Sequence, residues 1–470
     1  MTVTSTTDVV LSGTTTVSTT TSTTYIVLAT GTLDIASGGA VSGATAIGPG
    51  STMLIESGGT ATNSAIVGAV QFDYGSATGT VVSNGGVQHV YQGGTANDTT
   101  VATGGFQDVW QATVTNTTLS GYQQVLVGGL ATGTVVVSGG DEYVGTGGTT
   151  DGTVITANGL QYVDAGATAN GTQVDGAGFQ YVLGTATNTQ VNSSGFQEVA
   201  GTSSNTTVSS GAAQLVVLNG TATGTTVQAG GFQAVVNAAV NDTALSGSLQ
   251  VLAGGTSTNT VIAAGGNEYI GAGGSANGTV VNAGALQYVD SGGASTGTIV
   301  DGGLQFVAGT ASGTTVNSGG EVDVGSGGVA NNTQLSAGSE YVYAGGTAQG
   351  IDFTGSSGTL YTQNTSGLTG EVSNFAVGDT IDFLNTSVTS SSFDGSTLTL
   401  AVAGTNYTYQ FTGTEAGTTL NVGSDGHGGT AVTLALLAQA SASLVPGSDG
   451  GPIVSSDQTP TAPTLTHAAT

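Results

Sequence analysis

The chain has 470 residues, among them 28 carboxylates but no lysine, arginine or cysteine, so its formal net charge is −28. Without basic side chains it cannot neutralise phosphates, which argues against nucleic acid as a partner, and an anionic membrane surface would repel it. Disulfides and ion pairs to lysine or arginine cannot stabilise the fold. No run of 18 apolar residues occurs, so no transmembrane helix and no membrane insertion are predicted.

The N-terminal segment, residues 1–32, is rich in Thr and Val and is predicted to form strands or a cap. From residue 33 to about 365 the chain alternates short β-prone stretches with glycine corners such as Gly93-Gly94 and Gly147-Gly148. Glycine supplies the positive φ angles that sharp turns need. This region is therefore predicted to consist of many short strands separated by tight turns.

A repeat built around the motif GGFQDV runs through this region. Its central position is occupied by Gln88, Gln107, Gln123, Glu142, Gln161, Gln180, Gln197, Gln214, Gln233, Gln250, Glu268, Gln287, Gln305, Val322 and Glu340. The 14 steps between these ladder positions cover 252 residues, a mean period of 18.0. An apolar residue follows two places after every ladder position, as Val90 follows Gln88 and Leu252 follows Gln250.

Each repeat also contains a second short strand of the form T-x-V, as at Thr134, Thr189 and Thr279. Two short strands per 18 residues cannot form a separate domain, but stacked repeats bury a continuous core. We therefore predict an all-β fold, a parallel β-helix (β-solenoid) of ~18-residue rungs followed by a small C-terminal β capping module. At about 4.8 Å per rung, roughly 18 or 19 rungs would form a rod near 90 Å long.

Strand alternation decides which face of each rung points inward. The ladder residue and the aliphatic residue two places later share one face, while their neighbours include Asp108, Glu198 and Asp323. We therefore place the Gln/Val face inside, where stacked amides can hydrogen-bond along the column. The three ladder glutamates must then lie near a rim, be protonated or hold a metal ion, because a buried bare carboxylate is costly.

The outer face carries aromatic residues at rung spacing. Two successive runs stand out, namely Tyr143, Tyr162 and Tyr181, and then Tyr269, Tyr288 and Phe306. Such columns could bind a polysaccharide or a neighbouring rod. Alternatively they pack along the stack, because aromatic residues suit pleated surfaces. Both interpretations remain open at this point.

Segments such as GGFQDVWQATVTNTTLSG and GGTANDTTVATGG resemble the strand-loop-strand passenger repeats of AIDA-type autotransporter adhesins, and the resemblance covers roughly residues 33–350. It implies a right-handed β-helix located outside a bacterial cell or on its surface. It also implies roles in adherence, self-association and biofilm. Passengers of this family are often glycosylated on Ser or Thr.

The pattern changes at residues 366–436, which are predicted to form a separate β module. It is similar to the module that precedes Hint domains in secreted bacterial proteins, and it would cap the last rung of the solenoid. Its candidate calcium ligands are Asp379, Asp382 and Asp425, because hard oxygen ligands suit that ion. The alternative is that these aspartates stabilise turns.

The last segment, residues 437–470, contains four of the five prolines, Pro446, Pro452, Pro460 and Pro463. This composition is typical of an extended linker. Alternatively, the segment could add as a strand to a neighbouring subunit.

No catalytic site is predicted. A polysaccharide lyase would need a basic residue, the acids are scattered, and His89, His427 and His467 lie far apart. No nucleophile, zinc or phosphate-loop motif occurs. The first hypothesis is thus an extracellular structural or adhesive protein whose partner is itself, in a head-to-tail filament or by lateral association. The alternative is a polysaccharide-binding solenoid that uses the aromatic columns.

Overall fold

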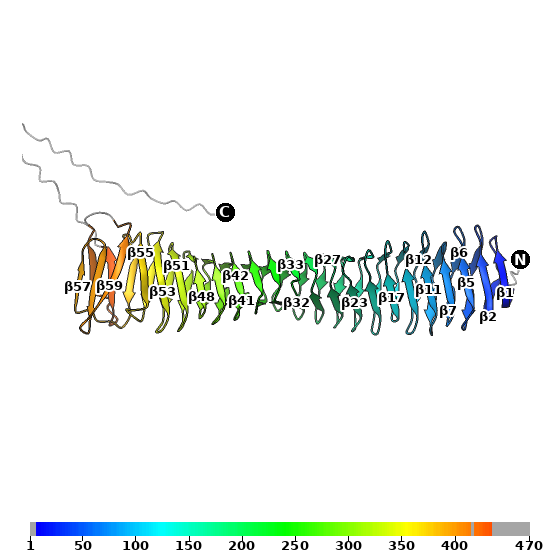
Figure 1. Ribbon diagram of the computed structural model, residues 1–470, viewed down its shortest axis with the longest axis horizontal. Helices are drawn as coiled ribbons and strands as arrows, with labels where there is room; N and C mark the ends of the chain where they lie inside the picture. Colours follow the sequence, from blue (N-terminus) through cyan, green and yellow to red (C-terminus); the bar gives the residue numbers. More distant parts are fainter. Residues whose placement is uncertain (1–5, 415–417, 435–470) are drawn as a thin grey trace, which may run out of the picture. The chain divides into compact units, whose positions relative to one another are not determined.

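The computed structural model describes residues 6–414 and 418–434, which lie in one compact unit, residues 1–435. These residues form 61 strands in a single hydrogen-bonded sheet system and no helix. Successive turns pair in parallel and form one continuous stack, as Figure 1 shows. There are about 20 turns with ~18-residue spacing. The prediction of an all-β, parallel β-solenoid is confirmed. None of the described residues forms a helix long and apolar enough to span a membrane.

Most turns contain three strands, whereas the sequence indicated two. In the turn that begins with β50 the second and third strands are joined into one, β51 (Val329–Leu335). One turn comprises β11 (Val87–Val90), β12 (Thr95–Asn97) and β13 (Thr100–Val101), and β14 (Phe106–Val109) then pairs with β11 in parallel. The T-x-V signal marks the third strand. The second strand turns only one side chain inward, here Ala96, so it leaves almost no hydrophobic pattern in the sequence.

The first strand of each turn carries the ladder position. These strands are β2 (Thr24–Ile35), β5 (Thr52–Ile55), β8 (Val70–Asp73), β11, β14, β17 (Tyr122–Val125), β20 (Asp141–Val144), β23 (Leu160–Val163), β26 (Phe179–Val182), β29 (Phe196–Val199), β32 (Ala213–Val217), β35 (Phe232–Val236), β38 (Ser248–Val251), β41 (Asn267–Ile270), β44 (Leu286–Val289), β47 (Leu304–Val307), β50 (Glu321–Val324), β52 (Ser339–Val342), β54 (Thr359–Thr362) and β56 (Thr380–Phe383).

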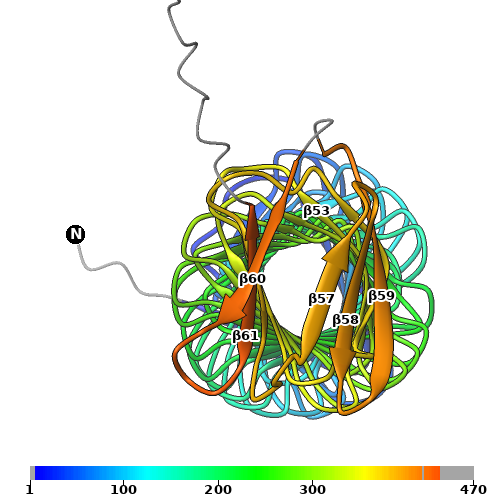
Figure 2. The same cartoon turned by 90° about the vertical axis from the view of Figure 1, so that its left-hand side faces the viewer.

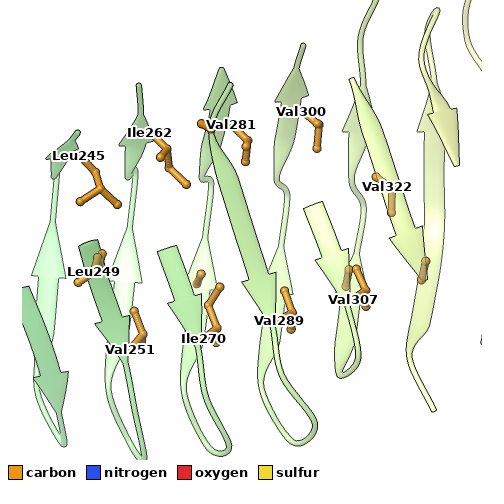
Figure 3. Packing of buried hydrophobic residues seen from close by; sticks show 14 of the residues in the cluster. Leu245, Leu249, Val251, Ile262, Ile270, Val281, Val289, Val300, Val307 and Val322 are labelled. Atoms are coloured by element: carbon orange, nitrogen blue, oxygen red, sulfur yellow. The ribbon is translucent and has the colours of Figure 1, made fainter. Parts of the chain in front are cut away.

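The Gln/Val face points inward, as predicted. Gln88 and Val90 are both fully buried, and the same holds for their equivalents turn after turn. The inward residues of the third strand, such as Ile262 and Val281, face them across the interior, as Figure 3 shows for ten labelled side chains. The core is thus a narrow column of Val, Ile, Leu and Ala with a polar ladder beside it.

One ladder position was predicted wrongly. In β38 the inward residues are Leu249 and Val251, and neither Gln250 nor Leu252 is fully buried. The cause is Gly247, where a Cβ atom would lie 2.4 Å from the carbonyl oxygens of Gln228 and Gly231. Only glycine fits there, so it fixes the start of the strand at Ser248, and a shift of one residue exchanges the two faces.

The two ends of the solenoid differ in the described residues. At the first end β1 (Thr7–Val17) pairs with β2 alone. At the other end β55 (Leu368–Ser373) and β56 continue the parallel stack. Strand β59 (Thr405–Thr412) then pairs with β55, and β61 (Thr430–Leu434) pairs with β56 in antiparallel fashion.

Three further strands extend these pairs, namely β57 (Ser390–Phe393), β58 (Thr397–Val402) and β60 (Leu420–Ser424). Figure 2 shows these strands across the end of the stack. After β56 the pairing is antiparallel except between β55 and β59, which are parallel, and this change lies within the segment predicted as a separate module. The predicted tail, residues 437–470, lies outside the described residues.

Candidate functional site

The ladder glutamines are hydrogen-bonded to one another along the axis of the solenoid. In each pair the side-chain Nε2 donates to the Oε1 of the glutamine one turn earlier, as from Gln180 to Gln161 (2.7 Å) and from Gln88 to Gln71 (2.8 Å). The same bond joins Gln197 to Gln180 and Gln214 to Gln197. These bonds satisfy groups that would otherwise be costly to bury.

A column of threonines also donates hydrogen bonds to the ladder residues. The hydroxyl of Thr172 donates to Gln161 Oε1 (3.2 Å), and that of Thr298 donates to Gln287 Oε1 (3.1 Å). The buried members of the column are Thr80, Thr99, Thr117, Thr134, Thr153, Thr172, Thr189, Thr206, Thr225, Thr243, Thr260, Thr279, Thr298, Thr314 and Thr333. The sequence showed this threonine as part of the T-x-V motif, but its place inside the solenoid was not predicted.

Two of the three ladder glutamates begin a run of glutamines. Glu142 Oε2 accepts from Gln161 Nε2 (2.7 Å) and from the Thr153 hydroxyl (3.0 Å). Glu268 Oε2 accepts in the same way from Gln287 Nε2 (2.8 Å). Burial raises the pKa of Glu142, and the donors around it act in the opposite direction. Both side chains are buried, so the option that they lie near a rim is wrong.

Glu340 has a different environment. It lies in register between Val322 and Leu360, it is fully buried, and neither carboxyl oxygen has a hydrogen-bond partner. Burial raises the pKa of Glu340 to about 8, and the Thr333 hydroxyl near it acts in the opposite direction without reaching hydrogen-bond geometry. Of the three alternatives that the sequence left open, the protonated form is therefore the one that fits this residue at neutral pH.

The six predicted surface aromatics form two stacks. Ring centroids lie 5.5 Å apart for Tyr143–Tyr162 and 5.3 Å for Tyr162–Tyr181. In the second run they lie 5.6 Å apart for Tyr269–Tyr288 and 5.0 Å for Tyr288–Phe306. All six side chains are half-buried, and their rings cover one another. Their use in binding remains a prediction.

A carboxylate holds the first ring of each stack. The Tyr143 hydroxyl donates to Asp164 Oδ2 (2.7 Å), and the Tyr269 hydroxyl donates to Asp290. The bond to Asp164 raises the pKa of Tyr143 to about 12. These contacts fix the outward edges of the rings.

Two of the three candidate calcium ligands accept hydrogen bonds from backbone N–H groups. Asp379 is buried and accepts from the N–H groups of Gly358 (3.0 Å) and Ala376 (2.9 Å). Asp425 accepts from the N–H groups of His427 and Gly429, and these bonds lower its pKa.

Burial raises the pKa of the third candidate, Asp382, and the charge of Asp425 adds to this effect. Within residues 6–414 and 418–434, no group of three or more acidic or histidine side chains is placed to hold a metal ion. Calcium binding therefore stays a prediction.

Together, the uninterrupted stack and its hydrogen-bonded interior define the protein as a parallel β-solenoid. Residues 67–121 match the family model described as the adhesin of the bacterial autotransporter system, probable stalk. The resemblance to AIDA-type adhesins is thus confirmed over this segment, and the chain is an adhesive protein of the cell surface or the extracellular space.

The solved structures that are similar to this chain include the following three. A hyper-glycosylated TibA fragment, glycosylated by TibC, has 29% identity and a TM-score of 0.24, over 76% of this chain and 100% of that one. A tailspike protein of E. coli bacteriophage HK620 has 10% identity and a TM-score of 0.17, over 87% and 84% of the chains. PfbA, a surface adhesin of Streptococcus pneumoniae, has 8% identity and a TM-score of 0.12, over 82% and 92%. No curated protein matches the chain.

Proposed function

We propose that this chain is a non-enzymatic adhesive stalk that acts through its length and stiffness. The observation that carries the proposal is the continuity of the stack, in which the ladder strands pair turn by turn from β2 to β56. At about 4.8 Å per turn, about 20 turns extend roughly 95 Å. A rod of this kind keeps its far end at a distance from the surface to which it is attached.

We further propose that the rods assemble head to tail and so contribute to cell adhesion or to a biofilm matrix. The outer edge of β1 has no partner strand among the described residues, and Val9 and Leu11 on this strand are 48% and 60% exposed. An open strand edge can pair with a strand of another chain. A contact between unlike ends does not close, so it would propagate into a filament.

Charge sets a condition on this assembly. Two rods of formal charge −28 each repel one another, and no lysine or arginine can relieve the repulsion. Salt screens charges that are separated by more than about 10 Å at 0.1 M. Assembly is therefore expected to strengthen as the salt concentration rises.

Electron microscopy of the purified full chain at low and high salt tests the proposal. Long filaments are expected at high salt, and single rods at both salt concentrations would contradict head-to-tail assembly. Leu11→Glu places a charge at the open edge and should abolish filaments. Leu218→Glu is the matched control, because Leu218 is also exposed (66%) but lies in the middle of the stack. It should leave the filaments intact.

A further inference from the structure

Two aromatic side chains differ from all the others in their exposure, and they lie on the same corner of the solenoid. Tyr74 is 39% exposed and Trp110 is 46% exposed, whereas every other Phe and Tyr in the described residues is half-buried or buried. Tyr91 lies on the turn between them. Each of the three residues directly follows a first strand, namely β8, β11 and β14, so they form one column along the axis.

This corner includes an edge-to-face pair of rings, whereas the rings of the two stacks meet at interplanar angles between 10° and 40°. Tyr91 meets Trp110 edge to face, with centroids 6.0 Å apart and an interplanar angle of 84°. Tyr74 is tilted by 46° against Tyr91 at 5.6 Å. An edge-to-face contact covers only one part of each ring system. The indole of Trp110, the one tryptophan of the chain, therefore keeps surface available for a ligand.

The aromatic rings of this corner pack against His89, and polar side chains lie next to them in the sequence. His89 stacks on Phe72 at 5.4 Å and on Tyr91 at 5.3 Å, which holds Tyr91 in place. Gln92 and Gln111, the residues after Tyr91 and Trp110, are exposed. Their amides can both donate and accept hydrogen bonds. The corner thus combines exposed ring surface with adjacent hydrogen-bonding groups.

Charge decides which ligand fits. Asp108 Oδ2 lies 3.3 Å from His89 Nδ1 at this corner. The whole chain carries a formal charge of −28 and has no lysine or arginine. An anionic polymer would be repelled. A neutral polysaccharide offers apolar sugar faces for the rings and hydroxyl groups for the amides.

We infer that the Tyr74–Tyr91–Trp110 corner binds an uncharged polysaccharide that lies along the rod. The column repeats once per turn, at about 4.8 Å, so an extended polymer meets a ring at each step. The inference goes beyond the proposed stalk function and does not depend on filament formation, because the corner lies on the side of the stack.

The single tryptophan reports on this corner directly. The full chain would be titrated with hydroxyethyl cellulose, galactomannan and dextran while the tryptophan fluorescence is recorded. At least one of these neutral polymers should shift the emission. Carboxymethyl cellulose, an anionic polymer with the same backbone as the first, should not. The absence of a shift with all three neutral polymers would overturn the inference.

Variants then locate the site by affinity electrophoresis in the polymer that binds. Trp110→Ala and Tyr91→Ala should each weaken binding about tenfold. Tyr162→Ala, in the half-buried stack of Tyr143, Tyr162 and Tyr181, is the matched control and should bind like the natural chain. Circular dichroism and melting show which variants keep the fold. If folded Trp110→Ala binds normally, or if Tyr162→Ala loses binding instead, the corner is not the site.

Discussion

The side-chain Nε2 of Gln161 donates to Oε2 of Glu142 across 2.7 Å inside the solenoid. In the glutamine ladder each amide N–H points to the turn before it, so every run must begin on a group that accepts without needing to donate. Glu142 and Glu268 are such groups, and the sulfur of Met53, 3.2 Å from Gln71 Nε2, has the same place in the first run. The glutamates therefore start hydrogen-bonded runs that point in one direction.

The first prediction concerns the start of the second run. Glu142→Gln keeps an acceptor for Gln161 and Thr153 and removes a buried acid, so the melting temperature at pH 7 should stay the same or rise. Glu142→Leu leaves both donors without partners, each at about 1–3 kcal/mol, and should lower it. Thermal melts of the two variants against the natural chain measure the difference. Equal melting of both variants would contradict this role for Glu142.

The second prediction concerns the gap in the ladder at Leu249. Gln233 Oε1 and the Thr260 hydroxyl both lack hydrogen-bond partners beside it. In Leu249→Gln the new amide would donate to Gln233 Oε1 and accept from the Thr260 hydroxyl. This polar substitution in the core should therefore be tolerated. Val251→Gln, on the same strand and equally buried, has no such partners and should destabilise the fold. Urea unfolding of both variants gives the comparison, and similar losses in both would refute the prediction.

The third prediction concerns pH. Burial raises the pKa of Glu340 to about 8 and that of Asp73 to about 7, from ordinary values of 4.5 and 3.8. Between about pH 4 and pH 8 the folded chain then binds more protons than the unfolded chain. Stability is accordingly greatest at the acidic end of this window and falls as the pH rises through it. Melting temperatures at pH 5, 7 and 9 should decrease in that order.

Glu340→Leu isolates the contribution of this carboxyl, because leucine continues the apolar column of Val322 and Leu360. The variant should melt higher than the natural chain at pH 9, and the two should differ least at pH 5. Repulsion among the other carboxylates acts equally on both chains. An unchanged pH dependence in the variant would show that Glu340 does not titrate as stated.

The fourth prediction separates a turn role from a calcium role at Asp379. Its two oxygens accept from the N–H groups of Gly358 and Ala376. Asp379→Ala leaves these groups without acceptors and should lower the free energy of unfolding by about 1–3 kcal/mol per lost partner if they stay buried. A chelator should leave the melting of the natural chain unchanged. A chelator-induced drop would instead favour a calcium site.

Much of this protein could be predicted from its period. Gln88 and Val90 share one face of their strand, and equivalent pairs recur with a mean period of 18.0 residues. This pattern alone determines an all-β stack and its inward face. The exposed corner left a signal of the same kind, because Tyr74, Tyr91 and Trp110 each come three residues after an inward residue, namely Gln71, Gln88 and Gln107. That signal did not distinguish a turn residue from a strand residue.

The sequence by itself thus determined the repeat, the buried ladder and the absence of lysine and arginine. The tertiary structure decided the third strand of each turn, the register at Leu249, the partners of Glu142 and the isolation of Glu340. The physical reason is that these features depend on the neighbouring turns. Three features are recognisable only when the neighbouring turns are in place. They are a short strand with one inward alanine, a glycine packed against carbonyl oxygens, and a buried acid without a hydrogen-bond donor.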